Sequence, residues 1–429
     1  MQVSNNKNST TALILTLVFP FGGLIYTLSH WREKWAKNTF WLACIYIGAV
    51  LIYWPEGTVL GDGADGGRYV LQLLDMYGSS LTIQSIISGF MVDQGSMDLY
   101  QPLMTYFISR FTDNGHVLFA AFAFVFGFFY SRNIWYVLEK LPDKKLGKLF
   151  ILVTLYFLIS PITNVNGVRM WTALHVFVYA LLPYLLERKR SKLWLILLTP
   201  LIHFSFLYIG VFALAFFLVP YRLKTESGIF LTLAYVLFVV TLFVNSLNLD
   251  EVNGVLAEYS PESYEARIDG YVNQNYLDAN KDRLALNNWY VKLSGNITHW
   301  GYSILLLLIL PCMKRNFKNE YGLMHLYIFA LLIGSFANIS ALIPSGGRFQ
   351  LVSQMFKVPL ILLVVSYIPQ NDNFHKVVNI ALLFLLLPLA VEFRKIFDFL
   401  GITAILGNFI TVFFWETNIP LIEYLKQLL

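Results

Sequence analysis

Long apolar runs recur along almost the whole chain, separated by short polar segments. They lie near residues 11–29, 39–54, 117–131, 149–162, 171–186, 193–219, 228–247, 298–313, 322–343, 350–368 and 377–391. A helix needs about 20 mostly apolar residues to cross a bilayer. The run at 193–219 is long for one span, so we divide it into two helices, one ending near Pro200. The pattern predicts an all-α polytopic membrane protein with about 12 spans, or 11 to 13 depending on the short run 402–414.

Composition and charge support this reading. Hydrophobic residues make up 57% of the 429 residues and charged residues only 13%, about half the share of a soluble domain. The net charge is +5. One set of alternate loops holds 18 basic and 7 acidic residues, whereas the other set and the N-terminus hold 11 basic and 17 acidic. Because cytoplasmic loops are rich in Lys and Arg, the imbalance places the N-terminus outside and gives no reason to expect nucleic acid as a partner.

We treat residues 1–429 as one membrane domain with two long external segments. The first covers 55–116 and carries a helical stripe of apolar residues from Val70 to Tyr77, which predicts interfacial helices. The second covers 248–297, where apolar residues at helical spacing predict a short helical hairpin. The two cysteines and seven histidines show no metal-ligand spacing, so we expect no structural metal site.

The first candidate site is a glycine-rich segment of the first external region. Asp62 and Asp65 stand there beside Arg68. One interpretation is a solvated turn whose charges pair with one another. The other is a site loop, in which the carboxylates orient or deprotonate a hydroxyl group and the arginine holds an anion.

Two further candidates lie between predicted spans. Asn166 and Arg169 enter a helix on which Arg169, Thr172 and His175 share one face. The guanidinium of Arg169 either reaches lipid head groups or binds a phosphate or diphosphate, to which its planar fork is suited. His203 stands at the predicted helix break, where it is either a satisfied core group or a general base.

The fourth candidate begins with Arg348 and continues along one helix face with Gln350, Gln354 and Lys357. A cation about two turns inside a span usually faces the bundle interior or a wet cavity. The alternative is a lysine that extends to the head groups. Taken together, the four candidates predict a site for phosphate or diphosphate near the outer membrane surface, with carboxylates and a histidine available as bases.

Several short motifs carry a resemblance over roughly residues 40–370. They are Asp65–Tyr69, Asp98–Pro102, Asn166–Ala173, His203–Ser205 and Gly347–Phe349. In their order and spacing the chain resembles the EpsG-type and Wzy-type polysaccharide polymerases of bacterial envelopes. That family commonly has an acidic residue before the proline where this chain has Gln101, so we assign Gln101 no role.

The resemblance implies a GT-C-like fold and a metal-independent, hexosyltransferase-like polymerase without a cofactor. Such an enzyme joins oligosaccharide repeat units on undecaprenyl diphosphate into O-antigen, capsule or exopolysaccharide. It works at the outer face of the bacterial inner (cytoplasmic) membrane. Its partners are the lipid-linked donor and acceptor glycans, the lipid bilayer and a chain-length regulator.

Each candidate residue then has a role in glycosyl transfer. The general base is His203, with Asp65 as its rival, and Arg169 binds the diphosphate of the donor. The substrate-binding residues are Asp62, Arg68, Asn166, Arg348, Gln354 and Lys357. Cationic side chains would stabilise the leaving diphosphate, as metals do in soluble transferases.

Two other functions stay open on sequence alone. A flippase for the same lipid-linked unit also needs cations in the membrane, but flippases usually place them in a central cavity between internal repeats, and we find no repeat. A membrane acyltransferase would need a histidine on the cytoplasmic side. His30 and His375 lie there, without carboxylates at a supporting spacing.

Overall fold

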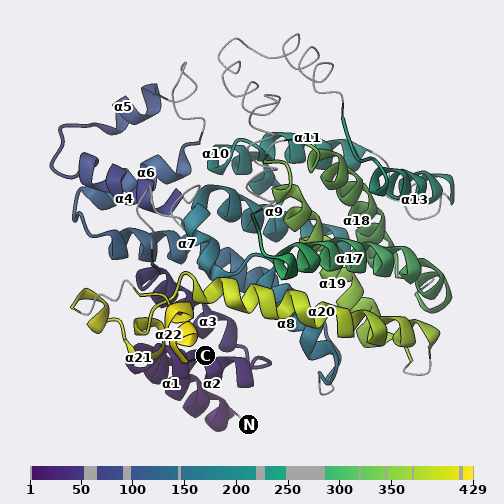
Figure 1. Ribbon diagram of the computed structural model, residues 1–429, viewed down its shortest axis with the longest axis horizontal. Coiled ribbons are helices and arrows are strands. Elements are labelled where there is room, and N and C mark those ends of the chain that lie inside the picture. The colour runs from purple at the N-terminus through teal and green to yellow at the C-terminus, as the bar shows by residue number, and fades with distance from the viewer. Residues whose placement is uncertain are drawn as a thin grey trace.

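The computed structural model describes most of the chain (Figure 1). The described residues are 2–52, 65–89, 98–143, 146–218, 228–247, 286–317, 320–343, 345–369, 372–414 and 419–428. Within these ranges the secondary structure is helical, with two isolated backbone bridges in place of a sheet. The expected all-α class is therefore confirmed.

The helices follow one another along the chain, and most of the α-helices are labelled in Figure 1. In the N-terminal part they are α1 (Gln2–Val18), α2 (Pro20–Ser29), α3 (Ala36–Ala49), α4 (Asp65–Met76), α5 (Ile83–Ser88), α6 (Tyr100–Ser109), α7 (Gly115–Leu138), α8 (Leu149–Leu158), the 3₁₀ helix η1 (Ile162–Gly167) and α9 (Val168–Glu187). They continue as η2 (Leu193–Leu198), α10 (Thr199–Ile202), α11 (Phe206–Leu218), α13 (Gly228–Leu242), α17 (Trp289–Asn316), α18 (Tyr321–Ser340), α19 (Arg348–Tyr367), α20 (Asn373–Phe397), α21 (Thr403–Leu406), η4 (Thr411–Phe413) and α22 (Leu421–Leu428).

Six helical segments in the described part of the chain are long and apolar enough to cross a membrane. They are Gly115–Leu138, Leu149–Glu187, Trp289–Asn316, Tyr321–Ser340, Arg348–Tyr367 and Asn373–Phe397. Shorter apolar helices accompany them. The chain is thus a multi-pass membrane protein, as its hydropathy pattern predicts.

The N-terminal apolar run 11–29 does not form the single span that we expected. It is divided into α1 and α2 at Phe19, which has an extended backbone, and Pro20 occupies the first turn of α2. Proline is suited to this position because its missing N–H would have no partner there, whereas it cannot continue an earlier helix. The two short helices pack against each other, with Gly23 in close contact with Thr16.

The run at 193–219 is also divided, at the break that we expected from the sequence. The helical chain continues through Pro200, which lies in the first turn of α10, and ends at Ile202. The break falls at His203–Ser205, before α11 begins. Because Leu193–Ile202 has only ten residues, its length is about half a bilayer and it is not a span of its own.

In the first external segment, α4 begins at Asp65. The expectation of a flexible glycine-rich loop at Asp65 and Arg68 is therefore wrong, because both lie in the first turn of a helix. The buried face of α4 also differs from the expected stripe. It is formed by Tyr69, Leu73 and Met76, whereas Tyr77 is exposed.

The remaining expectations about segments have mixed outcomes. Apolar residues 402–414 form only the short helices α21 and η4, so they make no thirteenth span. The predicted hairpin at 248–297 falls largely outside the described residues. Its last part belongs to α17, which begins at Trp289.

The best buried long helix is α19, with 78% of its most apolar window inside the protein. It packs against α18, α17 and α9. Figure 1 shows α4, α5 and α6 together beside α7, on one flank of this bundle. The site described next lies where α4 and α6 meet the first turn of α9.

Candidate functional site

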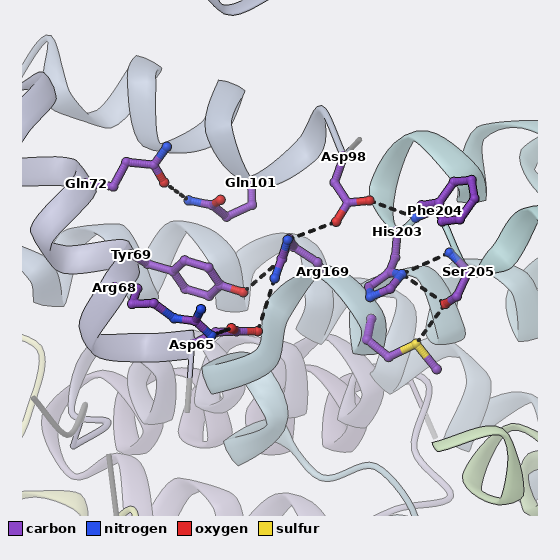
Figure 2. A network of polar contacts seen from close by, with 11 residues as sticks. Asp65, Arg68, Tyr69, Gln72, Asp98, Gln101, Arg169, His203, Phe204 and Ser205 are labelled. Carbon is purple, nitrogen blue, oxygen red and sulfur yellow. Dashed lines mark hydrogen bonds and ion pairs between the residues drawn. The ribbon is translucent and has the colours of Figure 1, made fainter. Parts of the chain in front are cut away.

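Arg169 is the centre of a polar network at the start of α9 (Figure 2). Its Nε donates to the hydroxyl of Tyr69 at 3.2 Å. Its Nη1 donates to the Asp98 carboxylate at 3.1 Å, and its Nη2 to the Asp65 carboxylate at 3.4 Å. The network thus joins α4, α9 and the residues just before α6. The network brings Asp65 from the first candidate segment to Arg169 from the second, and Arg68 joins it through Asp65.

Asp65 bridges two arginines with its two carboxylate oxygens. One oxygen pairs with Arg68 and the other with Arg169. Arg68 itself is half exposed. The pairing that the sequence offered as the solvated alternative is therefore present, but it also includes an arginine from a distant helix. Asp62 lies outside the described residues.

A glycine lets α4 approach α9 closely enough to form this network. A Cβ atom on Gly66 would lie 1.8 Å from the side-chain oxygen of Asn166, in η1. No real Cβ atom makes such a contact, so a larger residue at this position would have to displace the side chain of Asn166. The buried Asn166 oxygen has no hydrogen-bond partner among the described residues. Asn166 therefore packs against α4 at Gly66.

Asp98 is a functional candidate that the sequence analysis named only as part of a motif. Its side chain is 4% exposed. One oxygen accepts from Arg169 and the other accepts from the backbone N–H of Phe204 at 2.7 Å. The next residue, Leu99, donates its backbone N–H to Leu201 at 2.8 Å. Asp98 therefore holds the turn after α10 against the guanidinium of Arg169. Its burial and its contact with Arg169 are visible only in the tertiary structure.

His203 lies in that same turn, next to the network (Figure 2). Its Nδ1 accepts from the backbone N–H of Ser205 at 3.1 Å and lies 2.9 Å from the Ser205 hydroxyl. Since a backbone N–H can only donate, this contact places the proton of the neutral ring on Nε2. If Nδ1 instead carries the proton, it donates to the Ser205 hydroxyl and leaves Nε2 free as a base. The hydroxyl of Ser205 thus decides which role the imidazole can take.

Two arginines near the network, Arg169 and Arg348, have N–H groups that the described contacts do not use. Arg169 has five N–H donors, and the described contacts use three of them. Arg348, at the first turn of α19, has no ion-pair partner among the described residues, yet its charge acts on His203 together with those of Asp98 and Arg169. Burial raises the pKa of Tyr69, so its phenol remains neutral. The site therefore offers unused donors and an unpaired cation to an incoming anion.

Two residues on the predicted polar face of α9 do not belong to the site. Thr172 and His175 are both fully buried. The His175 ring lies 3.1 Å from the Ser160 carbonyl through Nε2 and 3.3 Å from the Asn133 amide through Nδ1. Both ring nitrogens thus have partners inside the protein, which makes His175 a core group.

Gln101 forms a separate part of the polar surface on α6. Its amide donates to Gln72 at 2.7 Å and to Thr105 at 2.9 Å, and the side chain is buried (Figure 2). These contacts tie α6 to α4. They give Gln101 a structural task, in keeping with its having no assigned role in the chemistry.

Lys357 faces the bundle interior, as its depth in the span predicts. It is 2% exposed, and its ammonium lies 5.0 Å from the centre of the Phe238 ring. No carboxylate pairs with it among the described residues. We expected Arg348 and Lys357 to line one cavity together with Gln354. Gln354 lines a cavity, but Arg348 and Lys357 are not among the residues of its wall.

Comparison with known proteins places the chain in a family. The model of the EpsG family matches residues 58–404, which include every candidate residue named above. No curated protein and no solved structure matches the chain.

Proposed function

The chain belongs to the EpsG family, and we propose that it is a polysaccharide polymerase of the bacterial envelope. In this proposal it is a glycosyltransferase that joins oligosaccharide repeat units carried on undecaprenyl diphosphate. It acts at the outer face of the inner membrane, with its N-terminus outside. Cationic side chains take the place of a metal ion, and a chain-length regulator is a further partner.

One observation carries the proposal: Arg169 is held by the carboxylates of Asp65 and Asp98, and Asp98 also binds the turn that contains His203. The contacts with Asp65 and Asp98 fix the guanidinium in one orientation. Fixed cationic donors stabilise negative charge on a leaving group without reorganising during the reaction. A diphosphate leaving group fits this arrangement, because it carries the most negative charge of the groups in the reaction.

The reaction that we propose balances as a direct displacement. The hydroxyl oxygen of the acceptor sugar forms a bond to C1 of the donor sugar. The bond between C1 and the diphosphate oxygen breaks, and the lipid diphosphate leaves with its electron pair. The hydroxyl proton passes to a base of the protein. The free N–H groups of Arg169 and the cations Arg68 and Arg348 stabilise the diphosphate.

The base is His203 in our proposal, and Asp65 is its rival. Nε2 of His203 has no partner among the described residues, and it can act as a base in the tautomer in which Nδ1 donates its proton to the Ser205 hydroxyl. That tautomer requires the imidazole to give up the contact from the Ser205 backbone N–H. Asp65 already accepts from two arginines, so both of its oxygens are engaged before a substrate hydroxyl arrives. Loss of a general base typically lowers the rate by about 10²–10⁴-fold.

The activity test uses the purified full chain in lipid nanodiscs, with lipid-linked repeat units isolated from cells that lack it. A polymerase lengthens the units into a ladder and releases lipid diphosphate. Transfer of units across a vesicle membrane without lengthening would instead indicate a flippase. An increase in mass by one acyl group would indicate an acyltransferase.

The base is then tested with single variants in the same assay. We expect His203→Ala to lower turnover by about 10²–10⁴-fold while donor binding persists. His375→Ala is the matched control, since His375 contacts the Ile368 carbonyl away from the network. Near-native turnover of His203→Ala, together with loss in Asp65→Asn, would move the assignment to Asp65.

A further inference from the structure

A partly open cavity with several polar groups in its wall lies between the helices of the bundle, and none of the Arg169 network residues line it. Its volume is about 720 Å³, within the range of roughly 300–1,000 Å³ typical of small-molecule sites. The wall is formed by α8, α13, α17, α18, α19 and α20. Helix α8 has only ten residues, or about 15 Å, and the last of them line the cavity. A short helix among long ones leaves this space within the bundle.

Amide and hydroxyl side chains line the cavity and form a chain of contacts. Gln350 donates to the side-chain oxygen of Asn338 at 3.1 Å, and Asn338 donates to the hydroxyl of Thr241 at 3.2 Å. His299 in the same wall interacts with Gln350. Such groups are expensive to bury among apolar helices unless they have partners. Here Gln350, Asn338 and Thr241 are partners for one another, which fixes their side chains in the wall of the cavity.

Gln354 is the exception, and it points to a ligand. It lines the cavity, is only 9% exposed, and has no hydrogen-bond partner among the described residues. Its amide lines the cavity, so its donors and its acceptor are available to water or to a ligand there. A primary amide both donates and accepts, and so does a sugar hydroxyl, so the two groups pair directly.

The wall also has the other features of a carbohydrate site. Trp300 and Tyr302 contribute aromatic surface. The acidic Glu392 is already paired with Lys395 at 2.6 Å. The cavity therefore offers amides, hydroxyls and aromatic rings among apolar side chains, with Lys292, Lys395 and His299 also in its wall and no unpaired carboxylate among its described lining residues.

Arg348 links this cavity to the network described above. Its chain neighbour Gly347 and nearby Gln350 both line the cavity, whereas the charge of Arg348 acts on His203. A glycan seated in the cavity would therefore lie near Arg348 along α19.

We propose that this cavity binds a sugar of the acceptor glycan and that Gln354 hydrogen-bonds its hydroxyl groups. The inference rests on the proposed polymerase function and deepens it by separating two substrate sites. The diphosphate of the donor binds at Arg169, and the acceptor sugar binds at Gln354.

The test varies donor and acceptor independently in the nanodisc assay. The donor is the lipid-linked repeat unit. The acceptor probe is the same repeat-unit oligosaccharide released from its lipid diphosphate by mild acid, so that it carries no phosphate. Its lengthening by one unit is measured by mass spectrometry.

The diagnostic variant is Gln354→Met, which has a similar volume. Because Gln354 makes no described hydrogen bond within the protein, the variant should fold and melt as the parent does. We expect the KM for the acceptor probe to rise about tenfold or more, the effect of losing one or two hydrogen bonds. The KM for the donor should stay within about twofold. Asn379→Leu is the matched control, because Asn379 is an amide on α20 that accepts from Lys148 outside the cavity.

The outcomes separate this inference from the proposed function. An unchanged acceptor KM in Gln354→Met, or an equal rise in donor KM, overturns the acceptor site while polymerisation by the parent protein still stands. A parent protein that builds no ladder from lipid-linked units overturns the proposed function itself, and the acceptor site with it.

Discussion

The substitution Asp98→Asn removes one charge from the centre of the proposed site and changes almost nothing in shape. Asp98 pairs with Arg169 through one oxygen and accepts the N–H of Phe204 through the other. The asparagine oxygen can keep the backbone contact. Its NH₂ group then faces the N–H groups of Arg169, and two donors cannot bond to each other. The perturbation is thus confined to the guanidinium.

The size of the effect follows from that one contact. A hydrogen bond to a charged group contributes about 1.5–3 kcal/mol. If Asp98 holds Arg169 for the transition state, turnover should fall by about 10- to 150-fold. Asp65 still pairs with Arg169, so the loss should not reach that of deleting the arginine.

A closely matched control exists elsewhere in the chain. Asp372 also accepts a backbone N–H, from Phe374 at 2.9 Å, and also pairs with an arginine, Arg315. The Asp372 side chain is 6% exposed. Arg315 is largely exposed, so that pair is screened by solvent and contributes little. Asp372→Asn therefore removes the same chemical group outside the proposed site.

The assay measures kcat and KM for the lipid-linked unit, with the amount of folded protein taken from its membrane level and thermal melting. We expect turnover to fall with Asp98→Asn and to stay within about threefold with Asp372→Asn. Near-native turnover of Asp98→Asn would refute the claim that Asp98 positions Arg169 for catalysis. An equal loss in both variants would assign the effect to general destabilisation.

Three further predictions concern single positions. Gly66→Ala should destabilise the protein by about 1–3 kcal/mol and abolish polymer, since its Cβ would overlap Asn166; Gly228→Ala, with open space around it, should melt as the parent does. Arg169→Lys should shorten the polymer in cells while the protein still accumulates, because lysine lacks the planar fork; normal-length polymer from Arg169→Ala would contradict a role in donor binding. Lys357→Met should raise thermal stability by about 1–4 kcal/mol, because it removes an unpaired buried cation, and should reduce polymerisation; a stabler variant with full activity would show that the charge serves no function.

The sequence by itself determined that the protein is a helical membrane protein. It also indicated that Lys357, a charged residue within a span, faces the interior of the bundle. Apolar runs of bilayer length admit few structures other than membrane helices, because every backbone polar group must find its partner within the membrane. Short motifs around Asp65, Arg169 and His203 marked the segments that meet in space.

Only the tertiary structure decided how those segments meet. Asp98 precedes α6 and lies 71 residues from Arg169, and nothing in local periodicity shows that its carboxylate joins Arg169 to the turn at His203. The contact of Gly66 with Asn166 depends on how two distant helices dock, which a one-dimensional pattern cannot encode. The docking of distant helices also places the polar residues in two separate groups, the network around Arg169 and the cavity at Gln354. Helix periodicity fixes which face a side chain occupies, but the partner of that face is set by packing between helices.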